Sequence, residues 1–131
     1  MLEHLVPVSA MANSSAYSRL PLIHAAAQGD ARWVQELLLS SDIEPDMRSF
    51  QGWTALQQAC AAKKGQVEAI VKLLIKHGAD VNATPGHGYS MTALQAACKA
   101  GRKPVVELLL SQGADVNALL EMSILWFQTT N

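Results

Sequence analysis

The stretch that decides the fold opens with Thr92-Ala93-Leu94-Gln95-Ala96-Ala97-Cys98 and closes with Gly113-Ala114-Asp115-Val116-Asn117-Ala118. A second copy lies upstream, opening with Thr54-Ala55-Leu56-Gln57-Gln58-Ala59-Cys60 and closing with Gly78-Ala79-Asp80-Val81-Asn82-Ala83. Self-similarity of this kind predicts a solenoid of stacked units, because each unit is too small to bury its apolar face alone.

Each unit is predicted to be a pair of short helices. Apolar residues recur at helical spacing in two blocks, and Thr54 and Thr92 stand where an N-cap hydroxyl would begin the first helix. A less regular unit starts at Leu20, where Gly29 is expected to end one helix and Asp30 to begin the next. We therefore expect a mobile leader over 1–17, a repeat domain over 18–118 with units near 18–51, 52–89 and 90–118, and an apolar tail over 119–131.

The order of residues in these units resembles the ankyrin repeat, whose signature is Thr-Pro-Leu-His-x-Ala at a period of about 33 residues. The resemblance covers about Leu20 to Ala118 and is carried most specifically by the two Gly-Ala-Asp-Val-Asn-Ala runs. It implies an all-α, ankyrin-type solenoid of stacked helix-turn-helix repeats with protruding hairpin-like loops, in which loop tips and first helices line a concave surface.

The chain departs from the family pattern mainly at its connections. Leu20 and Thr54 are 34 residues apart, whereas Thr54 and Thr92 are 38 apart, so the second unit carries extra residues. We place some of them in the inter-helix turn near Lys63 and the rest in the loop 84–91, since connections tolerate length. Glutamine replaces the family's histidine in the first helices and can still hydrogen-bond across repeats.

Composition argues against several function classes. The chain has 131 residues, is 50% hydrophobic and has a formal net charge of −1, so no nucleic-acid-binding field is expected. The apolar patch 5–8 is too short for a signal peptide, and no stretch approaches the length of a membrane span.

The two cysteines point to a reducing compartment. Cys60 and Cys98 occupy equivalent positions in successive units, so about one helix-packing distance, roughly 8–10 Å, should separate them. That separation exceeds the limit of about 7 Å between Cα atoms for a disulfide. We expect two buried free thiols in a cytoplasmic or nuclear protein.

No arrangement of residues predicts catalysis, a cofactor or a metal. The histidines lack metal-ligand spacing and no serine lies in a nucleophile motif, so the chain is expected not to be an enzyme. His24 is expected to be a partly buried polar contact, His77 to stabilise a helix C-terminus and Trp33 to join the core. By resemblance, Asn82 and Asn117 look like asparagines that intracellular hydroxylases modify in ankyrin repeats.

Two sets of residues are candidates for binding a partner. The first set is expected at the loop tips, where aromatic side chains would anchor an interface, although Trp53 could instead pack on the adjoining loop; it comprises Phe50, Gln51, Trp53, His87, Tyr89 and Met91. The second set is basic and should be gathered by stacking of the second and third inter-helix turns; it comprises Lys63, Lys64, Lys99, Arg102 and the neighbouring Lys103. The basic set fits an acidic peptide, a weak nucleic-acid contact or simply a solvated face.

The predicted function is that of a non-enzymatic scaffold that binds a protein partner of unspecified identity on its concave face. No small-molecule substrate, nucleic acid or membrane is expected as a partner. The alternative is a truncated or regulatory fragment of a larger ankyrin-containing enzyme or signalling protein. The tail 119–131 could cap the third repeat, mediate self-association or be an unstructured end.

Overall fold

The computed structural model describes residues 20–40, 42–49, 52–85 and 91–117, and every structural statement below refers to these residues. The leader predicted for 1–17 and the tail predicted for 119–131 lie outside them. Because of this, the roles suggested for the tail stay predictions.

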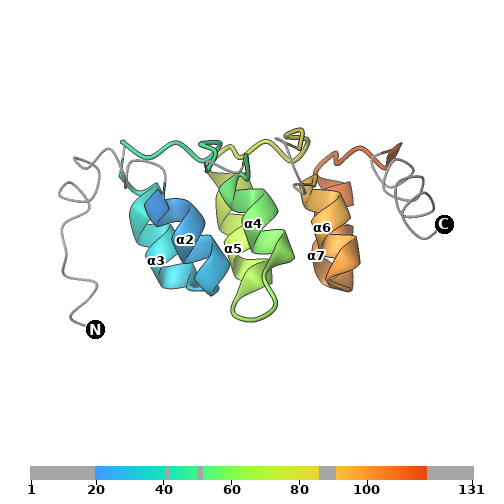
Figure 1. Ribbon diagram of the computed structural model, residues 1–131, viewed down its shortest axis with the longest axis horizontal. Coiled ribbons are helices and arrows are strands. Elements are labelled where there is room, and N and C mark those ends of the chain that lie inside the picture. The colour runs from blue at the N-terminus through green and yellow to red at the C-terminus, as the bar shows by residue number, and fades with distance from the viewer. Residues whose placement is uncertain (1–19, 41, 50–51, 86–90, 118–131) are drawn as a thin grey trace.

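The described chain folds into three antiparallel helix pairs that stand side by side (Figure 1). The pairs are α2 (Leu20–Gln28) with α3 (Ala31–Leu38), α4 (Ala55–Ala61) with α5 (Val67–Lys76), and α6 (Ala93–Lys99) with α7 (Lys103–Ser111). In place of strands, these residues contain one isolated antiparallel bridge, between Arg48 and Thr54. The predicted all-α solenoid of helix-turn-helix repeats is confirmed.

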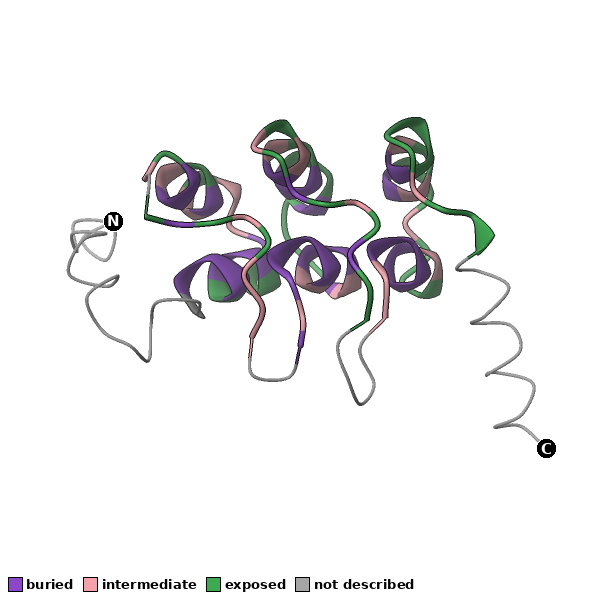
Figure 2. Cartoon of the chain, turned by 90° about the horizontal axis from the view of Figure 1, so that it is seen from above, coloured by how far each residue is buried: buried purple, intermediate pink, exposed green. Residues whose placement is uncertain are grey.

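The helices form two layers. The inner helices α2, α4 and α6 contact one another in succession, as do the outer helices α3, α5 and α7. Seen from above, the segments that join successive pairs project past the inner helices (Figure 2). Inner helices and projecting segments therefore bound one face of the array, which we call the concave surface.

The inner helices begin at reciprocal caps that the sequence encodes twice. Thr54 Oγ1 accepts a hydrogen bond from the backbone N–H of Gln57 (3.2 Å), and Gln57 Oε1 accepts one from the N–H of Thr54 (2.9 Å). The same pair of bonds joins Thr92 and Gln95, at 3.1 and 2.9 Å. Each capping box satisfies two backbone donors that a helix N-terminus would otherwise leave unpaired. Both predicted threonine caps are thus confirmed.

The core lies between the two layers. Small residues of the inner helices pack against larger aliphatic residues of the outer helices, and the bulkiest fully buried aliphatic side chains are those of Leu37, Leu56, Ile70, Leu74, Leu94 and Leu109. Trp33 is half-buried and packs against this core, as predicted. Leu73, which periodicity places in the buried stripe, is only half-buried because it lies at the edge of α5 that faces α3.

The expected burial is wrong for His24 and Cys98, whereas the expectations for Cys60 and His77 are confirmed. His24 is exposed rather than partly buried, and its ring meets Trp33 edge-on at 5.6 Å between centroids. Cys60 is buried as expected, whereas Cys98 is only half-buried; both are free thiols. His77 caps the C-terminus of α5, with Nδ1 2.9 Å from the carbonyl oxygen of Leu73.

The extra residues of the second repeat lie partly in its inter-helix turn, as predicted. This turn spans residues 62–66, whereas the corresponding turns of the first and third repeats span 29–30 and 100–102. The longer turn folds back onto the first repeat, where the backbone N–H of Gln66 donates to the carbonyl oxygen of Gly29 at 3.0 Å.

Candidate functional site

The predicted partner-binding residues fall on two opposite edges of the array. The loop edge comprises the described parts of 39–54, 77–92 and 112–117, at the top of Figure 1; the turn edge comprises 29–30, 62–66 and 100–102, at the bottom. Trp53 and Met91, the described members of the loop-tip set, belong to the loop edge, and the basic set lies on or beside the turn edge. The fold therefore does not combine the two sets into one site.

The two described residues of the predicted loop-tip set are more buried than exposed loop tips would be. Trp53 is half-buried, and its backbone N–H donates to Ser49 Oγ at 3.2 Å. Met91 is half-buried and packs against the core. The remaining members lie outside the described residues: Phe50, Gln51, His87 and Tyr89.

Two long polar side chains tie the first connecting segment and helix α4 to the second segment. Arg48 Nη1 donates to the carbonyl oxygen of Gly52 (2.7 Å), and Nη2 donates to that of Thr84 (2.8 Å). Gln57 Nε2 donates to the carbonyl oxygens of Ala83 (3.0 Å) and Thr84 (3.1 Å), which lie in the segment that joins the second repeat to the third. Gln57 is almost fully buried, so these bonds hold the second segment against α4 in one register.

A repeated side chain–backbone contact links each repeat to the next along the loop edge. Asp46 Oδ1 accepts from the backbone N–H of Asp80 at 2.8 Å, and Asn82 Oδ1 accepts from that of Asp115 at 2.7 Å. Asn82 also donates through Nδ2 to the carbonyl oxygen of Gly113 at 2.9 Å. Both amide atoms of this predicted modification residue therefore have partners. Asn117 is exposed on the last described repeat, and hydroxylation of either asparagine stays a prediction.

Sequence reasoning missed Asp46 and Arg48. Asp46 has a detectable signal, because it aligns with Asn82 when Leu37 is matched to Leu73. Arg48 aligns with Thr84 and has no counterpart in the other repeats, so its bridging role could not be read from the repeat.

The concave surface is shallow and lined by short side chains. Gln58, Ala61 and Cys98 are half-buried on its inner helices, and Ala27 is exposed. A hollow of about 320 Å³ lies between the second and third connecting segments, bounded by Val81, Asn82, Thr84, Pro85, Thr92, Leu94, Asp115 and Asn117. Its walls offer amide, hydroxyl and carboxylate groups around apolar contacts, a composition suited to a polypeptide segment.

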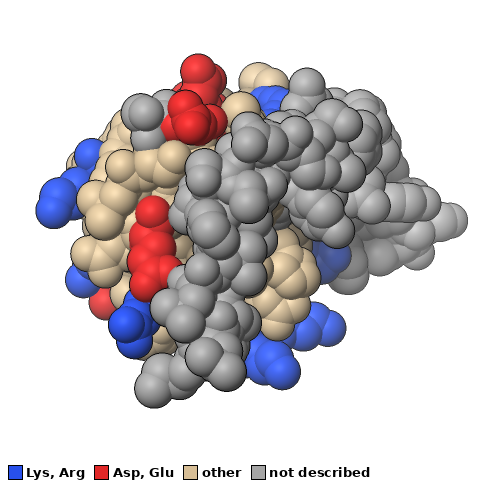
Figure 3. Space-filling model, turned by 90° about the vertical axis from the view of Figure 1, so that its left-hand side faces the viewer, with Lys and Arg blue, Asp and Glu red and all other residues tan. Residues whose placement is uncertain are grey.

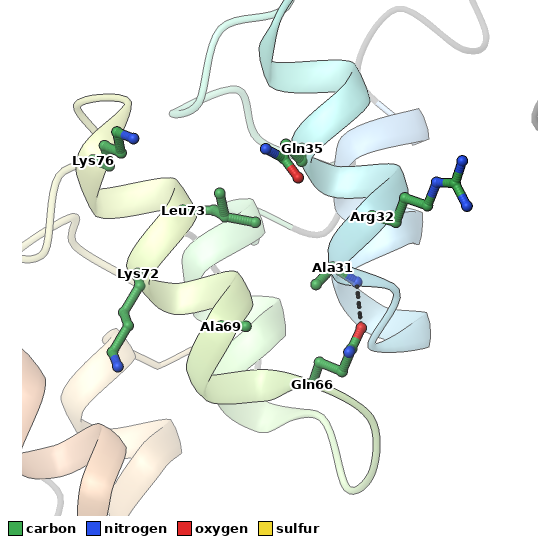
Figure 4. A pocket seen from close by; sticks show the side chains of 8 residues that line it. All are labelled: Ala31, Arg32, Gln35, Gln66, Ala69, Lys72, Leu73 and Lys76. Atoms are coloured by element: carbon green, nitrogen blue, oxygen red, sulfur yellow. Dashed lines mark hydrogen bonds between the residues drawn. The ribbon is translucent and has the colours of Figure 1, made fainter.

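A second hollow, of about 440 Å³, separates the outer helices α3 and α5 (Figure 4). Leu73 and Gln35 face one another across it, and Gln66 Oε1 accepts from the backbone N–H of Ala31 at 3.2 Å at one end. The side chains of Arg32 and Lys72 point away from the hollow. They are engaged with Glu36 and Glu68 on their own helices, so neither of these two cations is aimed into the hollow.

The turn edge gathers the basic set, as predicted. Lys63, Lys64 and Lys99 are exposed, and Arg102 is half-buried. The Arg102 guanidinium donates through Nε (3.1 Å) and Nη2 (2.8 Å) to the carbonyl oxygen of Ala62, which fixes the third turn beside the second.

The described residues contain no cluster of three or more His, Cys, Asp or Glu side chains that could hold a metal ion. Burial raises the pKa of the Cys60 thiol to about 12, against a smaller opposing effect of the Arg102 charge, and burial also raises the pKa of Cys98. Both thiols are therefore protonated and weakly nucleophilic at neutral pH. No described helix is long and apolar enough to cross a bilayer.

Comparison with known proteins assigns the architecture. Residues 22–119 match the family model described as Ankyrin repeats (3 copies). The putative ankyrin repeat protein YahD of Escherichia coli (strain K12) is 34% identical over 82 residues, which are 61% of this chain and 40% of YahD. The crystal structure of the human ASB11 ankyrin repeat domain is similar at a TM-score of 0.66 and 32% identity, over 74% of this chain and 41% of that chain.

The chain thus spans about two fifths of the length of both similar proteins. Ankyrin repeats are in general protein–protein interaction modules and are typically not enzymes.

Proposed function

Because the chain belongs to the ankyrin repeat family, we propose that it is a non-enzymatic module that binds a protein partner on its concave surface. The observation that carries this proposal is the set of side-chain bonds by which Arg48 and Gln57 hold the loop edge against the inner helices. A surface held in one conformation before binding loses little entropy when a partner docks.

The chemistry of the described residues supports binding over catalysis. The buried, protonated thiol of Cys60 offers no ready nucleophile, and the hollow beside Asn82 and Thr92 combines polar and apolar groups as a peptide-binding surface does. Free cysteines fit the reducing cytoplasm or nucleus as its compartment.

Site-specific photo-crosslinking in a cell lysate tests the proposal. A photoreactive side chain at Gln58, half-buried on inner helix α4, should yield a discrete crosslinked product; the same group at Gln35, exposed on outer helix α3, should not. A product formed from Gln35 alone would place the partner on the outer helices and overturn the proposal.

Substitution of the loop residues provides a second readout. The double change Trp53→Ala with Tyr89→Ala should reduce the crosslink from Gln58, since aromatic anchors contribute much of an interface's affinity. An undiminished crosslink would show that the partner contacts the inner helices without the loop tips. Circular dichroism should confirm that the double variant keeps its helicity.

A second proposal is that the array acts as one part of a larger ankyrin-containing enzyme or signalling protein. The chain covers 40% of YahD and 41% of the ASB11 chain, so related arrays do occur in longer polypeptides. An intact mass of the native protein equal to that of the 131-residue chain would contradict this proposal.

A further inference from the structure

Apart from the exposed charges on the outer helices, the two edges of the array carry charges of opposite sign. The loop edge carries one basic residue, Arg48, and five exposed acidic residues, which are Asp42, Glu44, Asp46, Asp80 and Asp115. At the turn edge of the second and third repeats lies the basic turn patch, which we define as Lys63, Lys64, Lys99, Arg102 and Lys103. Seen end-on, acidic atoms lie at the top and near the centre of the visible face, and basic atoms lie along the bottom and also at the left and near the top (Figure 3).

Although the formal net charge is only −1, the loop edge is therefore mainly acidic and the basic turn patch is positively charged. Within the described part of the chain, the four lysines of the patch take part in no ion pair. Glu68, which lines the same hollow as Lys63 and Arg102, is bonded to Lys72 at 3.3 Å on the surface of α5. Clustered cations without partners raise the local potential and favour an anionic ligand.

Two residues of the patch, Lys63 and Arg102, line a hollow that also contains Glu68. The hollow has a volume of about 390 Å³ and is lined by Lys63, Glu68, Ala100, Gly101, Arg102, Pro104 and Val105. Its lining thus combines cationic groups with short and apolar ones. Arg102 cannot swing away from it, because Nε and Nη2 are held by the carbonyl oxygen of Ala62, while Nη1 keeps its donors for a ligand.

We propose that the basic turn patch binds an acidic segment of a partner protein, at a site separate from the concave surface. Glutamate or aspartate carboxylates would pair with the lysines and with Arg102 Nη1, and a small side chain of the segment would enter the hollow beside Pro104. Charge-assisted hydrogen bonds to a fixed guanidinium are stronger than neutral ones and add direction to the attraction.

The extent of the patch favours a short peptide over nucleic acid. Asp30 stands in the first turn at the position that Arg102 occupies in the third, so the row of cations ends after two turns. Nucleic-acid binding draws its affinity from many phosphate contacts in series, which this short row cannot supply.

Fluorescence anisotropy with a defined probe tests the proposal on the full chain. The probe is a fluorescein-labelled peptide of alternating glutamate and alanine, and the control probe carries glutamine in place of glutamate. The glutamate peptide should bind saturably and be released by added salt, because exposed charges are screened beyond a Debye length of about 10 Å at 0.1 M salt. The glutamine peptide should not bind.

Matched variants locate the site. The triple change Lys63→Glu, Lys99→Glu and Lys103→Glu should weaken binding by roughly tenfold or more. Arg32→Glu, Lys72→Glu and Lys76→Glu make the same change of net charge on the outer helices and should alter affinity by less than about twofold. The milder Lys63→Gln, Lys99→Gln and Lys103→Gln, checked for helicity by circular dichroism, guards against a charge-reversed variant that fails to fold.

Three outcomes would overturn the proposal. They are no binding of the glutamate peptide by the wild-type chain, equal losses in the two triple variants, and tighter binding of a single-stranded oligonucleotide of the same charge than of the peptide. None of these bears on crosslinking from Gln58, so the two proposals can fail separately.

Discussion

The two joints of the array connect nearly identical repeats by different means. At the first joint the backbones meet, because a Cβ atom built on Gly29 would lie 2.6 Å from the Cα atom of Gly65. At the second joint the shorter third turn does not reach its neighbour with its backbone, and the Arg102 side chain spans the distance to the carbonyl oxygen of Ala62. Equivalent positions, Gln66 and Arg102, thus reach back to the preceding turn in both cases.

This difference shows that turn length decides which kind of bond joins the repeats. The five-residue turn 62–66 can lay its own backbone against the previous turn, provided that neither contacting residue carries a side chain. The three-residue turn 100–102 instead needs a long side chain with a hydrogen-bond donor to reach the neighbouring turn. The first joint should therefore be sensitive to added volume, and the second to loss of a hydrogen-bond donor.

The largest effect is expected from adding one methyl group at the first joint. Gly29 and Gly101 have the same turn geometry and φ values of 73° and 72°, but only Gly29 has another backbone against it. Gly29→Ala combines left-handed strain with a clash and should cost roughly 2–5 kcal/mol of unfolding free energy. Gly101→Ala should cost only the strain, about 1–2 kcal/mol. Urea denaturation measures both, and equal losses would remove the distinction between the joints.

A smaller effect is expected from removing the donor at the second joint. Arg102→Met keeps most of the side-chain volume but leaves the carbonyl oxygen of the buried Ala62 without this partner. The expected loss is about 1–3 kcal/mol. Arg102→Lys, which keeps a donor but not the planar fork, should fall between the variant and wild type. Unchanged stability of Arg102→Met in the same denaturation experiment would contradict the proposed role.

A smaller change still is expected at the loop edge, where the two joints use homologous contacts. Asn82→Asp removes the donor to Gly113 and should cost about 0.5–1.5 kcal/mol. The reverse change, Asp46→Asn, keeps the acceptor for Asp80 and adds a donor, so it should be neutral or slightly stabilising. Thermal unfolding of the two variants gives the comparison, and a loss in Asp46→Asn as large as in Asn82→Asp would show that the contacts are not equivalent.

Chemical labelling of the two cysteines tests the second joint in the wild-type chain, with the smallest perturbation of the structure. Cys60 is covered at this joint and Cys98, in the equivalent position, is half-buried, so iodoacetamide should alkylate Cys98 at least about tenfold faster near pH 8. Mass spectrometry follows both sites. Arg102→Met should speed labelling of Cys60 specifically, because it loosens the joint. Equal labelling of the two cysteines in the folded wild type would mean that the joint opens freely.

The Cys60 thiol also makes the free energy of unfolding depend on pH under alkaline conditions. Burial raises the pKa of Cys60 from its ordinary value of 9.0 to about 12, so the folded chain holds its proton where the unfolded chain has lost it. Stability is therefore complete below about pH 9 and falls as the pH rises toward 12. Cys60→Ala should flatten this fall.

The repeat pattern made most of the fold predictable. Thr54 and Thr92 identify the helix starts because an N-cap depends only on local residues, and the Gly-Ala-Asp-Val-Asn runs fix the register of the stack. Periodicity could not tell that His24 is exposed or that Leu73 faces the groove beside α3, because helix spacing does not say which neighbour covers which side.

The candidate sites were predictable only as sets of residue types. The sequence indicated that the basic turns should adjoin, since they occupy equivalent positions. The sequence could not indicate that two donors of Arg102 would bond to the carbonyl oxygen of Ala62, because this contact depends on the gap between two turns of unequal length. The bridge made by Arg48 depends likewise on where a neighbouring segment runs.

The contact between Gly29 and Gly65 gives each repeat a fixed place in any engineered array. The second repeat can follow only a unit whose turn offers a bare backbone, whereas a Cβ on Gly101 of the third repeat would meet no other residue within 4 Å. Changing the order of the repeats would disrupt the contact with Gly65 unless the unit placed before the second repeat also carries a glycine at the position of Gly29. Extension of the array is therefore expected to be tolerated behind the third repeat and to fail when a unit is inserted between the first two.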